Sequence, residues 1–227
     1  MKVIKENIVK VPIFQELPDE ALIPLIKAGS IIKYFKDQII LEEKEEGSSL
    51  FFLLSGKVKI IRKSEDDKEV ILNILREHDF FGEMSILDGY TRSATVIAME
   101  DSELFVLRRK EFISLIEHFP DVSIKLIQII SKRLRLANLK IKALSIGDSE
   151  KKVGSVLLHL AIDCGKYANN CVEISDLPIQ KEIANMAGTS RETVSRVFHI
   201  LMKKGLINYD EEKITILDFE KFQEAYK

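Results

Sequence analysis

The feature that most constrains the fold is a change in hydrophobic period near residue 110. Before it, residues 31–108 contain short runs of β-branched and aromatic residues, separated by Gly, Asp or Lys clusters. After Pro120, apolar residues recur at spacings of three and four, which is the helical period. The pattern predicts an α+β chain in which a β-rich region precedes a long helix.

The β-rich region is expected to form an antiparallel β-roll. Short strands at nearly regular spacing are typical of antiparallel sandwiches or rolls, and Gly47, Gly56 and Gly82 stand where the chain must bend sharply. Residues 1–30 predict short helices, with an acidic helix start at 17–20. The expected strands are 31–34, 38–41, 50–54, 57–62, 69–75, 94–98 and 103–107.

The long helix carries two apolar stripes. One has the 3, 4, 3, 4, 3 spacing of a coiled-coil seam. A helix with two apolar faces must pack against two surfaces, and we expect a second copy's helix on one side and the roll on the other. Burial within its own domain would leave the seam unexplained. The seam is Ile127, Ile130, Leu134, Ala137, Ile141 and Leu144, and the second stripe is Leu126, Ile129, Leu136 and Leu139.

The long helix is interrupted just before residue 148. Gly147 suits a helix C-cap, and Asp148 or Ser149 can cap the helix that follows. We therefore expect a boundary and hinge at 144–148. The predicted parts are an effector-binding β-roll at 1–120, a dimerisation helix at 121–146 and a C-terminal domain at 147–227.

Composition and residue spacing exclude several classes of protein. No apolar run approaches the ~20 residues of a membrane span, and the opening MKVIKENIVK lacks the apolar core of a secretory signal, so we expect a cytoplasmic protein without a membrane partner. Cys164 and Cys171 make neither a disulfide framework nor a zinc spacing, so no metal site is expected. The four histidines are scattered and no catalytic motif accompanies them, which leaves an enzyme as a remote alternative.

Residues 178–217 have the pattern of a winged helix-turn-helix. A first helix leads to Gly188, and a second begins after a Ser or Thr cap at 189–190. A hairpin with its turn at 208–212 and a returning strand at 214–217 would form the wing. The residues expected to pack inward are Ile183, Ala184, Ala187, Val194, Val197 and Leu201.

The other face of the second helix carries side chains that suit DNA. Arginine can pair with O6 and N7 of guanine, glutamate can accept from the cytosine amino group, and Lys203 and Lys204 suit phosphates. Alone, this face would fit a solvated helix with local ion pairs; the turn, cap and wing favour DNA. Residues 149–227 hold eleven Lys and Arg against twelve Asp and Glu, so affinity must come from a local cluster. The candidate DNA-binding residues are Ser190, Arg191, Glu192, Ser195, Arg196 and Lys203.

The stretch SRETVSR at 190–196 closely resembles the recognition helix of the cyclic-AMP receptor protein family of regulators, the Crp/Fnr family. The resemblance implies that Arg191, Glu192 and Arg196 read bases in an inverted repeat with TGTGA or TTGA half-sites. Many members have glycine at the position of Ser195, whereas a serine there resembles the oxygen-sensing branch, so both half-sites stay open. That branch's N-terminal cysteine cluster is absent here, so no iron–sulfur cluster is expected.

Residues 80–96 form a second informative run. It contains a glycine-rich bend, an acid, a small polar turn and a single arginine before a strand. Arg92 offers a planar fork to a phosphate, turn N–H groups can form an anion nest, and Glu83 can accept from a ribose hydroxyl. By itself the pattern also fits a structural turn with a buried ion pair.

The full run resembles the phosphate-binding cassette of cyclic-nucleotide-binding domains. The resemblance implies Gly82 and Glu83 at the ribose and Arg92 and Ser93 at the cyclic phosphate. In the cyclic-AMP activator the long helix offers adjacent Thr and Ser to the adenine; here Ala137 and Asn138 stand there, and only Asn138 can bond a base through its side chain. The implied effector-binding residues are Gly82, Glu83, Met84, Arg92, Ser93 and Asn138.

These features predict an effector-responsive, sequence-specific DNA-binding transcription regulator with no obligatory cofactor. The expected effector is a cyclic nucleotide, of which cyclic AMP is one possibility. The implied partners are a palindromic promoter site in double-stranded DNA, a second copy of the chain and RNA polymerase. Effector binding would set the spacing of paired recognition helices at ~34 Å. An alternative keeps the DNA-binding dimer with a non-nucleotide effector or with constitutive activity.

Overall fold

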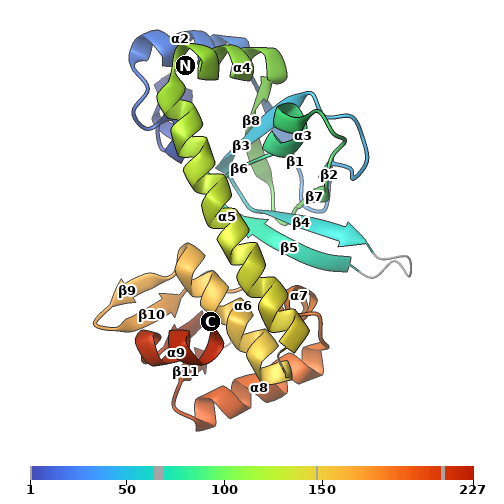
Figure 1. The fold of residues 1–227 in the computed structure, drawn as a ribbon, viewed down its shortest axis with the longest axis vertical. Coiled ribbons are helices and arrows are strands. Elements are labelled where there is room, and N and C mark those ends of the chain that lie inside the picture. The colour runs from blue at the N-terminus through green and yellow to red at the C-terminus, as the bar shows by residue number, and fades with distance from the viewer. Residues whose placement is uncertain (1, 64–68, 147, 211–212) are drawn as a thin grey trace. The chain divides into compact units, whose positions relative to one another are not determined.

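Figure 1 shows a computed structural model of the chain, which describes residues 2–63, 69–146, 148–210 and 213–227, apart from the side chains of 2, 3, 139, 140 and 142–146. The chain divides into two compact units, Met1–Ile130 and Ser131–Lys227. The long helix α5 (Pro120–Ile146) begins in the first unit and ends in the second. Each unit is described separately below.

The first unit is built on two four-stranded antiparallel sheets. Their strand orders are β1-β8-β3-β6 and β2-β7-β4-β5. Every predicted strand is present to within one residue at either end, so the expected roll is confirmed, whereas β6 was not predicted because it has only two residues. The strands are β1 Ser30–Tyr34, β2 Ile39–Leu41, β3 Ser49–Ser55, β4 Val58–Lys63, β5 Glu69–Leu75, β6 Phe80–Phe81, β7 Thr95–Ala98 and β8 Ser102–Arg108.

Short helices close a hydrophobic core at one end of the roll. They are α1 (Lys2–Ile8), the 3₁₀ turn η1 (Pro12–Phe14), α2 (Asp19–Ala28) and α4 (Arg109–His118), and α2 and α4 lie side by side in Figure 1. As predicted, α2 begins immediately after Pro18. The core centres on Phe52, which is fully buried and lies 4.7 Å from Phe14 and 6.0 Å from Phe105 between ring centroids. Burial of apolar and aromatic side chains is the main source of stability for such a unit.

Helix α5 has the predicted two faces. Leu126 is buried in the core of the first unit, and Ile129 packs against that core. Ile130, which the sequence placed in the seam, is also partly buried against that core, because it lies at the edge shared by the two stripes. In contrast, the seam residues Ile127, Leu134 and Ile141 are 62%, 60% and 61% exposed, although each is a large apolar side chain. The side chains of Leu139 and Leu144 lie outside the described residues.

The second unit combines helices with one antiparallel sheet in the order β11-β12-β10-β9. Asp148 caps α6 by accepting a hydrogen bond from the Lys151 backbone at 2.9 Å, as predicted, while Gly147, the expected hinge, lies outside the described residues. The elements are α6 Ser149–Cys164, β9 Lys166–Ala168, β10 Cys171–Ile174, α7 Gln180–Ala187, α8 Arg191–Lys203, β11 Ile207–Asp210, β12 Lys213–Ile216 and α9 Phe219–Tyr226.

The sheet of the second unit differs from the sequence prediction at two points. Asn208–Asp210, predicted as part of the wing turn, belong to strand β11; the other two residues of that prediction, 211–212, lie outside the described residues. The hairpin β9–β10 was not predicted. It turns at Asn169 and Asn170, both at positive φ, a conformation that asparagine tolerates better than most residues.

The two cysteines have local structural roles. Each thiol donates a hydrogen bond to a backbone carbonyl at 3.2 Å, Cys164 to Leu160 and Cys171 to Leu217. Within the described ranges, no group of three or more His, Cys, Asp or Glu side chains could hold a metal ion. No helix among the same residues is long and apolar enough to span a membrane.

Candidate functional site

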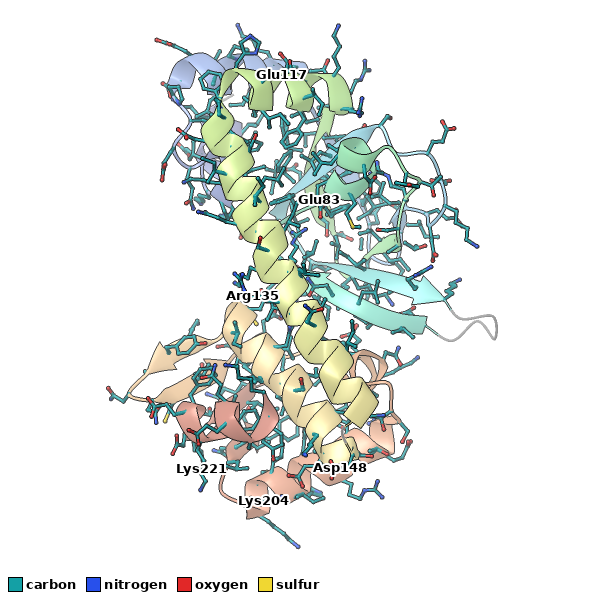
Figure 2. The ribbon with its side chains drawn as sticks, viewed as in Figure 1. Glu83, Glu117, Arg135, Asp148, Lys204 and Lys221 are labelled. Atoms are coloured by element: carbon teal, nitrogen blue, oxygen red, sulfur yellow. The ribbon has the colours of Figure 1, made fainter. Side chains whose placement is uncertain are left out.

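The most unusual burial in the first unit is on the segment from Gly82 to Arg92. Glu83, Ser85 and Arg92 are three of the four buried polar side chains among the described residues. Glu83 and Ser85 lie on the short helix α3 (Glu83–Asp88), which replaces the polar turn expected from the sequence (Figure 2). Glycines at both ends of α3 adopt the left-handed conformation, with φ of 85° at Gly82 and 78° at Gly89.

Arg92 is held in a fixed orientation. It is 6% exposed, and its Nη1 donates to the Gly82 carbonyl at 2.9 Å and to the Ser85 hydroxyl at 2.7 Å. Its Nη2 donates to the Ser49 carbonyl at 2.8 Å, and its Cζ lies 5.8 Å from the centre of the Phe51 ring. Burial lowers the pKa of Arg92, while the charges of Glu83 and Glu45 raise it. Because a guanidinium stays protonated in proteins, the segment contains a fixed positive charge.

The loop before β3 makes room for this arginine. A Cβ on Gly47 would lie 2.2 Å from the Ser85 hydroxyl and 2.7 Å from Arg92 Cζ, so any larger residue would force these side chains to shift. The same loop bonds the backbone of Arg92, whose N–H donates to the Glu45 carbonyl at 2.8 Å and whose carbonyl accepts from Lys44 at 2.9 Å. The sequence identified Gly47 as a turn glycine only, because this contact joins positions 45 residues apart.

The structure brings five of the six candidate effector-binding residues into one segment. Gly82, Glu83 and Arg92 are described above. Met84 is 53% exposed, and the exposed Ser93 hydroxyl donates to its sulfur at 3.6 Å. The sixth candidate, Asn138, belongs to α5 in the second unit and has an exposed side chain.

In the second unit, α7 and α8 form the predicted helix-turn-helix. Gly188 ends α7 in the left-handed conformation with a φ of 59°, and the Ser190 hydroxyl caps α8 by accepting from the Thr193 backbone at 3.2 Å. The residues predicted to pack inward are buried. Phe198, also buried, packs edge-on against Tyr209 of the wing at 4.9 Å. This packing fixes which face of α8 is exposed.

The exposed face of α8 borders an open recess of about 600 Å³. Every predicted DNA-binding residue except the cap residue Ser190 lines it. Sequence reasoning missed Gln180, His199 and Ile200: helical spacing from Arg196 could have revealed His199, whereas Gln180 depends on how α7 packs against α8. The lining residues are Gln180, Arg191, Glu192, Ser195, Arg196, His199, Ile200 and Lys203.

Adjacent lysines at the end of α8 have different environments. Lys203 lines the recess. Lys204 instead bonds both Glu150 carboxylate oxygens, at 2.6 and 2.8 Å, and the Tyr226 hydroxyl donates to the same carboxylate at 2.7 Å. Lys204 is therefore paired with an anion that α6 supplies, and its expected phosphate contact stays a prediction. The bond from Lys204 lowers the pKa of Glu150, and burial together with Glu150 raises the pKa of Tyr226.

A β-roll with a buried arginine, joined to a winged helix-turn-helix, is the architecture of one class of protein, the transcription regulators with an effector-binding domain. Residues 31–119 match the cyclic nucleotide-binding domain, and residues 151–225 match the Crp-like helix-turn-helix domain. The chain is 34% identical over 196 residues to the cyclic AMP receptor protein of Thermus thermophilus, covering 86% of this chain and 88% of that protein. It therefore belongs to the Crp/Fnr family of DNA-binding transcription regulators, and it is not an enzyme.

Two further comparisons cover almost the whole chain. A CRP-like cAMP-activated global transcriptional regulator of Mycobacterium tuberculosis is 29% identical over 216 residues, covering 95% of this chain and 96% of that one. The solved structure of a CooA mutant from Carboxydothermus hydrogenoformans superposes with a TM-score of 0.76 at 24% identity, covering 90% of each chain, which supports the fold alone.

Proposed function

We propose that the protein is a cyclic-nucleotide-gated homodimer that binds an inverted repeat, with cyclic AMP as the first candidate effector. The observation that carries the proposal is the orientation of Arg92. A guanidinium has five N–H donors, and three bond protein oxygens within the described residues. The Nε–H and one Nη2–H remain, and two such donors suit a bidentate pair with phosphate oxygens.

The residues around Arg92 suit the rest of a nucleotide. Glu83 is an acceptor in its ionised form and suits a ribose hydroxyl, Ser93 suits a phosphate oxygen, and Asn138 suits the base. Because the surroundings of Arg92 already hold its side chain in place, little side-chain entropy would be lost on binding. Two relatives that match most of the chain are named for cyclic AMP, which supports this effector class.

The exposed stripe on α5 suits a second copy of the chain. Ile127, Leu134 and Ile141 are seven residues apart, a coiled-coil period, and would be buried between two such helices. A dimer can present two recognition helices to successive major grooves ~34 Å apart. Arg191, Glu192 and Arg196 would read TGTGA-like or TTGA-like half-sites of a promoter, where RNA polymerase is the expected further partner.

Gating would act through the relative stability of two dimer arrangements. The functional division is a roll at 1–120, a dimerisation helix at 121–146 and a DNA-binding domain at 147–227. A nucleotide bound to the roll favours the DNA-competent arrangement only by the difference in its affinity for the two arrangements.

A Leu134→Asp variant tests the dimer directly. Sedimentation should give dimers for the natural chain and monomers for the variant, and an unchanged mass would exclude this interface.

The effector assignment is tested by isothermal titration with cyclic AMP, cyclic GMP and a cyclic dinucleotide. The natural chain and an Arg108→Ala control, which removes an exposed arginine of the roll, should bind one nucleotide with micromolar affinity. Arg92→Lys, which keeps the charge but loses the planar fork, should weaken binding at least tenfold. No heat from any nucleotide would exclude nucleotide gating while leaving DNA binding by the second unit in place.

A further inference from the structure

His199 occupies the middle of the DNA-facing surface of α8. Glu192, Arg196, His199 and Lys203 follow one another at spacings of four, three and four, so they share one face of the helix. His199 is exposed and lines the recess, one helical turn from Arg196 on one side and from Lys203 on the other. The imidazole has no hydrogen bond or ion pair within the described residues.

The charged groups around this imidazole are mostly cationic. From α8 the recess has three cations, at Arg191, Arg196 and Lys203, and one anion, at Glu192. The helix packed against it, α7, contributes the neutral Gln180, whose amide donates to the Tyr209 hydroxyl of β11 at 3.3 Å. His199 therefore lies among three cations, on the surface that would bind DNA in the proposed function.

Protonation changes what a histidine can offer DNA. The neutral ring has one N–H donor, whereas the imidazolium has two donors and a positive charge. Histidine is the side chain whose charge changes most readily within the physiological pH range. Duplex DNA carries one negative charge per ~1.7 Å of its axis, and that field favours the charged form.

The position of His199 along α8 indicates whether it would contact a base or a phosphate. The first turns of a recognition helix reach base edges, and Arg191 and Glu192 occupy the first turn of α8. His199 stands two turns further on, beside Lys203. We propose that His199 is a phosphate contact whose protonation is linked to DNA binding, so that affinity for DNA rises as pH falls from 8 to 6. This inference rests on the proposed DNA-binding function.

The test compares DNA affinity across pH in matched variants. Fluorescence anisotropy at constant ionic strength, with saturating cyclic AMP, would use a duplex bearing two inverted TGTGA half-sites and a duplex of unrelated sequence at pH 6, 7 and 8. The natural chain and a Lys221→Ala control, remote from the recess, should bind both duplexes about tenfold more tightly at pH 6 than at pH 8. His199→Asn should remove this difference, and His199→Lys should keep tight binding at every pH.

Salt dependence supplies an independent readout. At pH 6, His199→Asn should reduce the slope of log affinity against log salt by about one for each subunit, as expected for a lost phosphate contact. Equal pH ratios in the natural chain and His199→Asn would overturn the inference while leaving DNA binding intact. Absence of duplex binding by every variant at every pH would instead overturn the proposed function. Because His199 is exposed, all variants should fold, which circular dichroism checks.

Discussion

Both candidate sites depend on arginine, but the two units place it in opposite environments. Arg92 in the roll is 6% exposed and donates three hydrogen bonds to protein oxygens. Arg191 and Arg196 on α8 are exposed and border an open recess. Arg92 is oriented by its own unit, whereas Arg191 and Arg196 would be oriented by DNA.

Because of this difference in burial, Arg92 is expected to contribute to stability as well as function, whereas Arg191 and Arg196 contribute to function alone. Burial of a charge is unfavourable unless hydrogen bonds compensate it, so the surroundings of Arg92 and the arginine depend on each other. Exposed arginines cost the fold almost nothing, and their substitution changes function alone. A small anionic ligand needs a preformed site, while a DNA duplex presents enough phosphates to orient flexible side chains.

The largest expected effect is that of Arg92→Ala. The change removes the donor that the Gly82 and Ser49 carbonyls and the Ser85 hydroxyl share, so the free energy of unfolding should fall by about 3 kcal/mol. Nucleotide affinity should fall at least a hundredfold. Urea unfolding followed by titration measures both. A variant as stable as the natural chain would contradict the contrast between the two arginines.

Arg196→Ala should change DNA recognition and leave stability almost unchanged. Loss of one bidentate base contact should remove about 2 kcal/mol of discrimination at a single base pair, while unfolding free energy stays within about 0.5 kcal/mol of the natural value. Anisotropy on duplexes with single-base changes measures the discrimination. Uniform weakening on every duplex would instead make Arg196 a phosphate contact.

Gly47→Ala sharpens the comparison because it disturbs Arg92 without removing it. The new methyl group would overlap the Ser85 hydroxyl and Arg92 Cζ, and overpacking of this kind costs about 1–2 kcal/mol. Nucleotide affinity should fall roughly tenfold, and nucleotide-independent DNA binding should be unchanged. Gly89→Ala, at a glycine whose added Cβ meets nothing within 4 Å, controls for loss of a glycine in the same segment. Natural nucleotide affinity in Gly47→Ala would show that the orientation of Arg92 is unimportant.

The smallest effect concerns Glu150, an intermediate case in which a partly exposed charge is held internally by Lys204 and Tyr226. Because the folded-state pKa of Glu150 is lowered, its stabilising contribution is present above the unfolded pKa and is lost as pH falls through the folded pKa. Glu150→Gln should lower unfolding free energy by about 1 kcal/mol at pH 7. Urea unfolding should show that this difference shrinks below about pH 4. A difference independent of pH would exclude the ion pair as its cause.

The sequence predicted the parts of the molecule that periodicity encodes. Regularly spaced runs of β-branched and aromatic residues located the strands of the roll, and helical spacing separated Val194 and Val197 from Arg191 and Arg196. Six residues between Gly82 and Gly89 are too few for a period, so α3 was missed. The functions of Gly47 and Lys204 arise from contacts between distant positions, at Arg92 and at Glu150. Local patterns do not encode such contacts, and they could not reveal that Ile130 packs against the roll core.

The most direct test of the account is DNA binding with and without nucleotide. Footprinting of the natural chain on an inverted repeat of TGTGA half-sites should show at least a tenfold gain in affinity when saturating cyclic AMP is added. Arg92→Lys should bind the same site equally with and without nucleotide. Equal occupancy by the natural chain in both conditions, despite nucleotide binding at Arg92, would contradict the claim that the roll controls the DNA-reading helices.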